Sequence, residues 1–151
     1  MVGFLVFITD VHALGLDVAK GILVTDSAYW DRDDTTRAFT KRFQARHGKV
    51  PSAEQAGVYA SVLHYLKGVR EAGSKDAIAV MAAMRRLPVD FLGRPATIRE
   101  DGRVVFDLTL YEVKAPNESR YPWDYYRRVA DIPAASAFRP LVQSDCPMIR
   151  R

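Results

Sequence analysis

The sequence predicts an α/β fold. Two short apolar runs, 2–8 and 22–25, have the pattern of strands that are buried on both faces. Three segments with helical periodicity follow at 35–46, 52–72 and 75–87, before a stretch of period two. This order of strands, helices and hairpin indicates the α/β class. The two buried strands also need neighbouring strands, and the sequence does not supply enough of them.

The loop after the first predicted strand contains candidates for a ligand site. If residues 2–8 form a strand, Asp10 and His12 lie just beyond its carboxyl end. Ligands of open α/β sheets bind outside such strand ends. A carboxylate there can pair with a ligand ammonium group, and His12 can donate or accept a hydrogen bond. The alternative is that Asp10 caps backbone N–H groups of its own loop.

The longest helical pattern covers residues 52–72. Ser52 and Gln55 have the spacing of a capping box, and Gly73 stands where a C-cap is expected. His64 is expected on the surface of this helix. Apolar residues at spacings of three and four predict one buried helical face. This apolar set consists of Ala56, Tyr59, Val62, Leu63, Leu66 and Val69.

The two neighbouring helices also have recognisable ends. Asp33 or Asp34 is expected to cap the helix over 35–46, and Ser74 is expected to cap the helix over 75–87. These signals are local, because each rests on a side chain that can accept from a nearby backbone N–H group.

The last third of the chain changes character. Residues 96–113 predict a β-hairpin that turns at Asp101–Gly102, and the tail from Lys114 concentrates proline and aromatic residues. Such a tail is too apolar for a flexible linker, so it is expected to wrap over a body. The residues expected to share one face of the hairpin are Val104, Phe106, Leu108 and Leu110.

The composition is that of one ordinary globular domain. The 151 residues are 48% apolar and 26% charged, with a net charge of +4. No basic stripe with interleaved aromatics points to nucleic acid. No apolar run reaches the ~18 residues of a membrane span. Residues 1–13 lack a basic first region, so a buried strand explains them better than a signal peptide. The lone Cys146 excludes an internal disulfide.

Motifs for covalent chemistry, cofactors or metals are not found in the sequence. It has no P-loop, no GxGxxG, no GxSxG and no HExxH. Asp31-x-Asp33 begins like a calcium loop, but Thr36 and Arg42 stand where that loop requires Gly and Glu. The sequence therefore predicts no cofactor, no metal site and no enzyme.

Several spaced segments together resemble the C-terminal part of type I periplasmic solute-binding proteins of ABC importers, in the branched-chain amino acid family. These segments are ITDVHALGLDVAKGILVTDSAYWD, KVPSAEQAGVY, IREDGRVVFDLTLYEVKAP, PWDYY, IPAASAFRPL and SDCP. Members of this family have two α/β lobes joined by crossovers and clamp a small ligand between them. The resemblance thus implies an incomplete three-layer αβα fold of the type I periplasmic-binding-protein class.

By this resemblance, residues 1–27 finish the second lobe, 28–113 form the C-terminal part of the first lobe, and 114–151 form a tail that crosses back. A loop matching TDVH binds the ligand's amino group in relatives, which assigns that contact to Asp10. Gln55 matches a position that touches the ligand side chain. The best-known relatives have an aromatic residue there, so Gln55 leaves room for a polar or aromatic ligand.

Two further residues are candidates at the expected crossover, Ala28–Asp31. Tyr29 and Trp30 can stack on a ligand, or they can pack at a hinge. The resemblance also implies a periplasmic location, an amino acid or an aromatic or amide analogue as ligand, and an ABC permease as partner of the full-length relative.

The function predicted from the sequence is therefore the solute-binding receptor of an ABC importer, which closes around its ligand. The alternative is a ligand sensor or regulator of the same fold that is not linked to transport. A chain of this length that binds nothing on its own is a third possibility.

Overall fold

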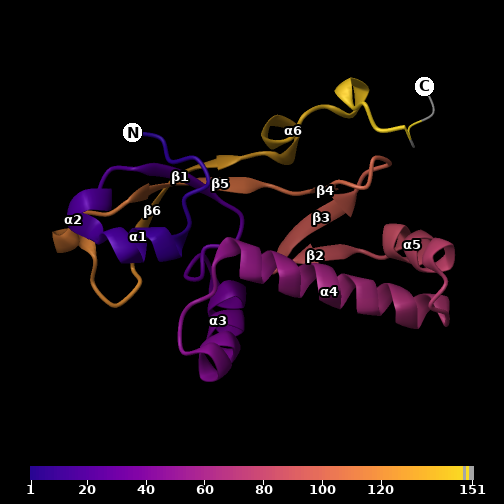
Figure 1. Cartoon of the computed structure of the whole chain (residues 1–151), viewed down its shortest axis with the longest axis horizontal. Helices are drawn as coiled ribbons and strands as arrows, with labels where there is room; N and C mark the ends of the chain where they lie inside the picture. The colour runs from indigo at the N-terminus through magenta and orange to yellow at the C-terminus, as the bar shows by residue number, and fades with distance from the viewer. Residues whose placement is uncertain (148, 150–151) are drawn as a thin grey trace. The chain divides into compact units, whose positions relative to one another are not determined.

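The computed structural model describes residues 1–147 and 149 and contains both helices and strands (Figure 1). The α-helices are α1 (Ile8–Leu14), α2 (Leu16–Ala19), α3 (Asp34–His47), α4 (Ala53–Ala72), α5 (Ala77–Arg86) and α6 (Ala134–Ala137). The strands are β1 (Leu23–Asp26), β2 (Val89–Phe91), β3 (Arg94–Ile98), β4 (Val104–Val105), β5 (Leu108–Val113) and β6 (Tyr126–Ile132). Short 3₁₀ helices cover Pro116–Glu118 and Leu141–Gln143.

The chain divides into two compact units. Unit 1 consists of Met1–Ala56 and Leu108–Ile132, and unit 2 consists of Gly57–Asp107 and Pro133–Arg151. The predicted tail, 114–151, includes residues 148, 150 and 151, which lie outside the described part of the chain. Assignment of these segments to lobes stays a prediction.

Unit 1 is built on a three-stranded sheet in the order β1-β5-β6, and both pairings are antiparallel. The strand predicted at 22–25 is confirmed as β1, and its partner in the sheet is β5. Leu23 pairs with Glu112 and Asp26 with Thr109, so β1 runs against β5. β6 was not predicted, because its burial follows no alternation and most of its residues are exposed.

The strand predicted over residues 2–8 is wrong. Only an isolated parallel bridge joins Val2 to Leu23, and Leu5 has a φ of 54°, which breaks the extended backbone. The Asp10 carboxylate accepts from the Phe7 N–H group at 2.8 Å, which starts α1 at Ile8. The segment predicted as a ligand-binding loop is therefore a capped helix.

The core of unit 1 combines aliphatic residues of the helices with aromatic residues of the sheet. Val11 of α1 and Val113 of β5 are almost fully buried. The buried face of β5 is the one with Thr109, Tyr111 and Val113. The predicted shared face of Val104, Phe106, Leu108 and Leu110 is therefore wrong. Leu108 and Leu110 lie on the less buried side of β5, while Val104 and Phe106 belong to unit 2.

Helix α3 forms nearly where the sequence predicts it. Asp33 is the N-cap, and its carboxylate accepts from the Thr36 N–H group at 2.9 Å. Gly48 ends the helix with a φ of 80°, in the left-handed region that glycine adopts without strain. His47 is the last helical residue.

Helix α4 and its capping box are confirmed. The Ser52 N–H group donates to Gln55 Oε1 at 3.0 Å, and the Gln55 N–H group donates to Ser52 Oγ at 3.4 Å. Gly73 follows the helix with a φ of 59°. The prediction of its buried face is wrong, however. Leu63 is 38% exposed and Leu66 is 55% exposed.

A different stripe of α4 is covered in unit 2. His64, expected on the surface, is buried, and its Nε2 lies 2.9 Å from the carbonyl oxygen of Met84. Gly68 faces the side chains of Met84 and Val80 on α5. Small residues and a histidine thus form the covered stripe, because α5 approaches too closely for a large side chain at position 68.

Helix α5 begins later than predicted and has a different cap. Asp76 accepts from the Ala79 N–H group at 2.9 Å, whereas Ser74 Oγ accepts from the Asp76 N–H group. Asp76 is therefore the N-cap, and the assignment of Ser74 is wrong.

The second sheet, in unit 2, has the antiparallel order β2-β3-β4. The predicted turn is confirmed between β3 and β4, where Gly102 has a φ of 81°. The predicted second arm is split, because β4 ends at Val105 and β5 belongs to the sheet of unit 1. Phe91 and Phe106 stack with ring centroids 4.4 Å apart.

Candidate functional site

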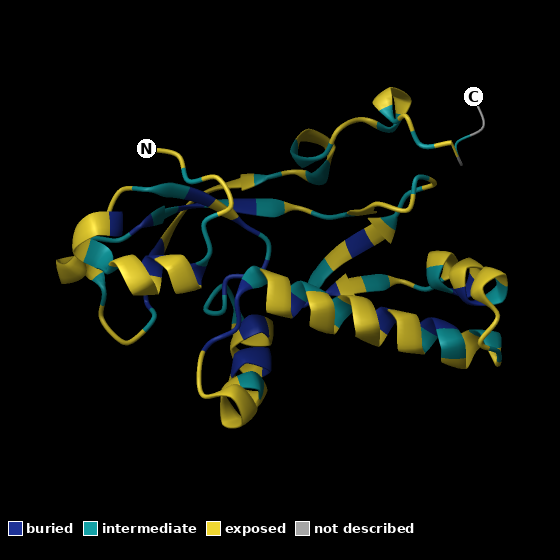
Figure 2. Cartoon of the chain, in the orientation of Figure 1, coloured by how far each residue is buried: buried dark blue, intermediate teal, exposed yellow. Residues whose placement is uncertain are grey.

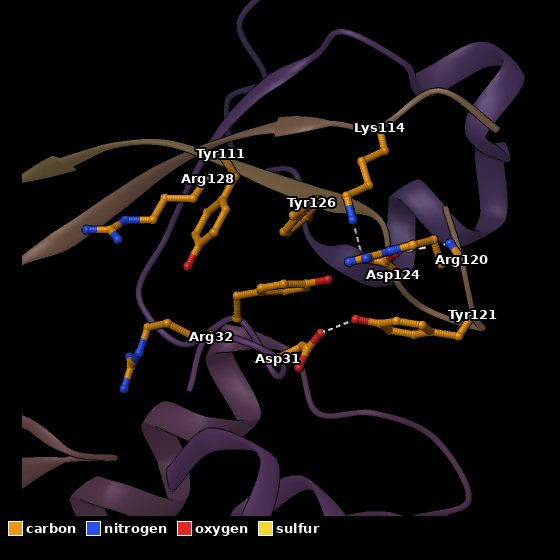
Figure 3. Close-up of a pocket in the computed structure, with 10 residues that line it drawn as sticks. Asp31, Arg32, Tyr111, Lys114, Arg120, Tyr121, Asp124, Tyr126 and Arg128 are labelled. Atoms are coloured by element: carbon orange, nitrogen blue, oxygen red, sulfur yellow. Dashed lines mark hydrogen bonds and ion pairs between the residues drawn. The ribbon is translucent and has the colours of Figure 1, made fainter. Parts of the chain in front are cut away.

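A pocket of about 200 Å³ lies within unit 1 (Figure 3). Its walls come from the loop after β1, from β5 and the residue after it, and from β6 together with the segment that leads into it. The lining residues are Tyr29, Asp31, Arg32, Tyr111, Lys114, Arg120, Tyr121, Asp124, Tyr126 and Arg128.

Three buried tyrosines form the aromatic part of this pocket. The Asp26 carboxylate accepts from the Ala28 N–H group at 2.6 Å and turns the chain as it leaves β1. Tyr29 then packs against Tyr111 and Tyr126, with ring centroids 5.3 and 5.0 Å away. Such distances are typical of aromatic pairs and give the pocket an apolar wall.

Ion pairs hold the polar part of the pocket. Asp124 is 2% exposed and accepts from Lys114 Nζ and from the Arg120 N–H group. Burial alone raises the pKa of Asp124, but the hydrogen bonds from Lys114 and Arg120 outweigh it and lower this pKa below its ordinary value. Asp31 accepts from the Tyr121 hydroxyl at 2.6 Å. Both carboxylates are therefore held in place by hydrogen bonds.

The lining has more positive than negative charge. Its four basic residues and two acidic residues give a formal charge of 4 − 2 = +2. Of the basic side chains, Arg120 is 77% exposed and reaches Asp124 only at 3.8 Å. Arg32 and Arg128 pair with Asp33 and Asp131, which are not part of the lining, so Arg120 is the basic side chain best placed to approach an anionic group from the solvent side.

The Tyr126 hydroxyl is the most informative atom of the site. Tyr126 is 4% exposed, and its hydroxyl has no hydrogen-bond partner among the described residues. Burial, with Asp26 next in size, raises its pKa above the ordinary range, so the hydroxyl stays protonated at physiological pH. A buried hydroxyl without a partner costs about 1–3 kcal/mol, and a ligand acceptor removes that cost.

Three of the predicted site residues meet around Trp123. The Trp123 carbonyl accepts from Trp30 Nε1 at 2.9 Å and from the Tyr29 hydroxyl at 3.3 Å. His12 stacks on the Trp123 ring at 4.0 Å, and its Nδ1 lies 2.7 Å from the Tyr125 hydroxyl. Tyr29 also lines the pocket, whereas His12 and Trp30 do not.

The other two predicted residues cap helices. Asp10 caps α1, which agrees with the backbone-capping alternative, and Gln55 closes the capping box of α4. Both side chains are exposed, and neither lines the pocket. A ligand role for Asp10, His12, Tyr29, Trp30 or Gln55 stays a prediction.

Sequence reasoning missed most of the pocket. The tail aromatics were noticed as a cluster, and Tyr121 and Tyr126 belong to it. Lys114 and Asp124 had no signal, because their pairing joins the end of β5 to a loop ten residues later. In the described part of the chain, no group of three or more histidine, cysteine or acidic side chains could hold a metal ion. No described helix is long and apolar enough to cross a membrane.

The helices, the two sheets and this polar, aromatic pocket define an α/β protein with a candidate site for a small molecule. The periplasmic binding protein family matches residues 1–119, and the chain belongs to this family. No curated protein matches the chain significantly.

Two solved structures show the extent of the match. A periplasmic binding protein from Burkholderia mallei is 44% identical, with a TM-score of 0.94 over 99% of this chain. A branched chain amino acid ABC transporter periplasmic ligand-binding protein from Burkholderia xenovorans LB400 is 43% identical, with a TM-score of 0.91 over 97%. The chain spans 40% of the length of each of these proteins. The fold is therefore an incomplete type I periplasmic-binding-protein fold.

Proposed function

We propose that the chain acts in the solute-binding component of an ABC importer and that its ligand is a small carboxylate, either a branched-chain amino acid or a related aromatic or amide compound. The observation that carries this proposal is the buried, unpartnered Tyr126 hydroxyl in a pocket with a net positive lining. The Burkholderia xenovorans relative, a branched chain amino acid transporter protein by its description, supports the transport role.

In this proposal the Tyr126 hydroxyl donates to the ligand carboxylate. Arg120 approaches the same anion from the solvent side, and the ring of Tyr29 packs against the apolar part of the ligand. A volume of about 200 Å³ lies below the ~300–1,000 Å³ of sites for drug-sized molecules, which limits the ligand to a small one.

The amino group of an amino acid ligand is assigned to Asp10. The charge of Asp10 is among those that raise the pKa of Tyr126, and this supports the assignment. Gln55, at the start of α4, is the proposed side-chain contact. His12 and Trp30 hold the Trp123 segment in shape and serve the site through it.

Binding involves no covalent step and proceeds by closure of two lobes around the ligand. In this scheme residues 1–27 complete the second lobe and residues 28–113 complete the first lobe. The tail, residues 114–151, crosses back to the second lobe. The grouping of β5 with β1 in unit 1 suggests that the return crossing begins earlier, near Leu108.

The test is a thermal-shift and calorimetric screen with leucine, isoleucine, valine and benzoate. Benzoate is included because a solute-binding protein from Rhodopseudomonas palustris was solved with it, although that protein is 19% identical and shares only the fold. A ligand at 100 times its Kd stabilises by about 2.7 kcal/mol, which a thermal shift detects readily.

Tyr126→Phe identifies the atom responsible. The variant is expected to be at least as stable as the parent without ligand and to bind the best probe about 10- to 100-fold more weakly, because it lacks a donor to a charged group. Tyr65→Phe is the control, since Tyr65 belongs to unit 2, is 46% exposed and does not line the pocket. Unchanged affinity in Tyr126→Phe would show that the ligand does not use this pocket.

A further inference from the structure

Residues 120–124 form a turn at the edge of the pocket, and we call them the rim turn. The Asp124 N–H group donates to the Tyr121 carbonyl oxygen at 3.1 Å, which closes a four-residue turn with Pro122 at its second position. Arg120 and Tyr121 are exposed, whereas Asp124 is buried, and all three line the pocket. The rim turn therefore reaches from the solvent into the pocket wall. In contrast to most of unit 1's core, part of it is exposed to solvent (Figure 2).

The third position of this turn is strained. Trp123 has a φ of 69°, in the left-handed region, where turns with proline at the second position normally have glycine or asparagine. A bulky side chain adopts this region only under strain. Such strain persists where surrounding contacts impose it, and it is typical of segments that clamp ligands or move.

Contacts within unit 1 hold the Trp123 end of the rim turn. The Trp123 carbonyl accepts from Trp30 Nε1 at 2.9 Å, and its indole ring stacks on His12 with ring centroids 4.0 Å apart. The neighbouring Asp124 is 2% exposed and forms an ion pair with Lys114. This end of the turn is therefore fixed.

The Tyr121 end is held more loosely. Tyr121 is 41% exposed, and its hydroxyl donates to the Asp31 carboxylate at 2.6 Å (Figure 3). This hydrogen bond, with burial second, raises the pKa of Tyr121, so the hydroxyl stays protonated and remains a donor. Asp31 lies in the loop after β1 and is itself held by Arg37 of α3 at 3.0 Å. The hydrogen bond thus joins the rim turn to a second wall of the pocket.

This arrangement is suited to opening and closing. Water competes for the hydroxyl of an exposed tyrosine, so its bond to Asp31 breaks more readily than the buried contacts of Asp124. Once that bond is broken, the ring of Tyr121 keeps an edge-to-face contact with Trp30, at 6.3 Å between centroids. The strain at Trp123 further favours departure from the closed turn.

We propose that Tyr121 and Asp31 form a latch on the pocket, in which their hydrogen bond holds the rim turn closed and its release lets a small carboxylate enter and leave. This motion takes place within unit 1 and is separate from the closure of two lobes. The identity of the ligand rests on the function proposed above, whereas the opening of the rim turn can be measured without any ligand.

Hydrogen exchange of single amides, followed by NMR on the full chain without ligand, measures the opening. Tyr121→Phe removes only the latch hydroxyl and should speed exchange of the Asp124 amide about three- to tenfold, the factor that one net hydrogen bond contributes. The Val113 amide, which donates to the Ile22 carbonyl in the same unit, should keep its rate. Unchanged exchange at Asp124 would overturn the latch. Equal acceleration at Val113 would also overturn it, because it would indicate a general loss of stability.

Asp31→Ala tests the other partner of the latch. It should speed exchange at Asp124 by a similar factor, and adding Tyr121→Phe should give less than about a twofold further increase, because both changes remove the same bond. A double variant whose acceleration equals the product of the two single accelerations would argue against a shared bond. Tyr65→Phe is the matched control, since Tyr65 is 46% exposed, belongs to unit 2 and does not line the pocket.

Stopped-flow fluorescence with leucine and with benzoate tests the passage of a ligand. In Tyr121→Phe the association and dissociation rate constants should both rise by about threefold or more, because a latch limits movement in both directions. A rise in the dissociation rate constant alone would show that the hydroxyl contacts the ligand, and the latch would be rejected. If neither compound binds the parent chain, the proposed function fails, and hydrogen exchange alone decides whether the latch exists.

Discussion

The ion pair between Lys114 and Asp124 allows a sharp test of how unit 1 is held together. Asp124 has a side chain that is 3% exposed, and Lys114 one that is 13% exposed. Replacing one partner of a buried pair leaves the other uncompensated and typically costs 3–5 kcal/mol. We expect Asp124→Asn to cost about 3 kcal/mol, at the lower end, because the flexible Lys114 stem can carry its ammonium group towards water.

Unfolding in urea measures this loss of stability, and because urea is uncharged it does not screen the ion pair. A loss of about 3 kcal/mol corresponds to a fall in Tm of roughly 6–12 °C for a protein of this size. Lys114→Met combined with Asp124→Asn should be less destabilised than Asp124→Asn alone, since the double variant leaves no unpaired charge. Arg120→Gln is the control. It should change stability by less than about 0.5 kcal/mol, because Arg120 is 77% exposed and 3.8 Å from Asp124.

The same pair sets a pH dependence. The pKa of Asp124 is lower in the folded chain than its ordinary value of about 3.9. Its stabilising contribution is therefore fully present above that ordinary pKa and is lost as pH falls through the lowered pKa of the folded state. The difference between parent and Asp124→Asn should shrink below pH 4. Two results would refute this account. One is a double variant whose loss of stability equals the sum of the losses in Lys114→Met and Asp124→Asn. The other is a stability difference between the parent and Asp124→Asn that grows as the pH falls.

Two further predictions concern helix ends and glycines. Ser52→Ala should cost about 1 kcal/mol in urea unfolding, since it removes the hydroxyl that accepts from the Gln55 N–H group, and a loss below 0.2 kcal/mol would contradict the capping box. Gly57→Ala should stabilise the chain by roughly 0.5–1 kcal/mol, because it lies within α4 and an added Cβ meets nothing within 4 Å. Gly48→Ala has equal space but a φ of +80°, so it should destabilise by about 1 kcal/mol, and the same sign for both glycine variants would be inconsistent with this reasoning.

Local signals in the sequence predicted helix ends well. Asp33 and the pair Ser52–Gln55 work through hydrogen bonds that span three residues, so their effect is readable from neighbouring letters. At α5 the expected cap, Ser74, is wrong, and Asp76 is the N-cap instead. Both make a capping-type hydrogen bond, and the sequence did not indicate which residue begins the helix.

Strands were predicted less well, because a strand requires a partner. Residues 2–8 are apolar enough for a buried strand, but one bridge to Leu23 and the left-handed Leu5 leave them extended only in part. β6 has little apolar character and exists through its pairing with β5. Pairing depends on residues far away in the sequence, and period alone cannot supply it.

The candidate site was predictable only in outline. Tyr29 and the aromatic tail could be selected from the sequence, but the pocket forms because Tyr29, Tyr111 and Tyr126 meet from three distant segments. The importance of Tyr126 depends on its burial and on its unpartnered hydroxyl, and neither property is visible in a list of residues. The resemblance to solute-binding proteins gave the family, which the match over residues 1–119 confirmed.

Helix α4 explains why periodicity identified an apolar face correctly and misjudged what covers it. Periodicity measures which side of a helix avoids water, and it found Val62, Leu63 and Leu66. Coverage depends instead on what else the chain provides, and unit 2 provides only α5, which packs at Gly68. The apolar side of α4 is therefore readable from the sequence pattern, whereas its covered side follows from the close approach of α5 at Gly68, which the pattern does not encode.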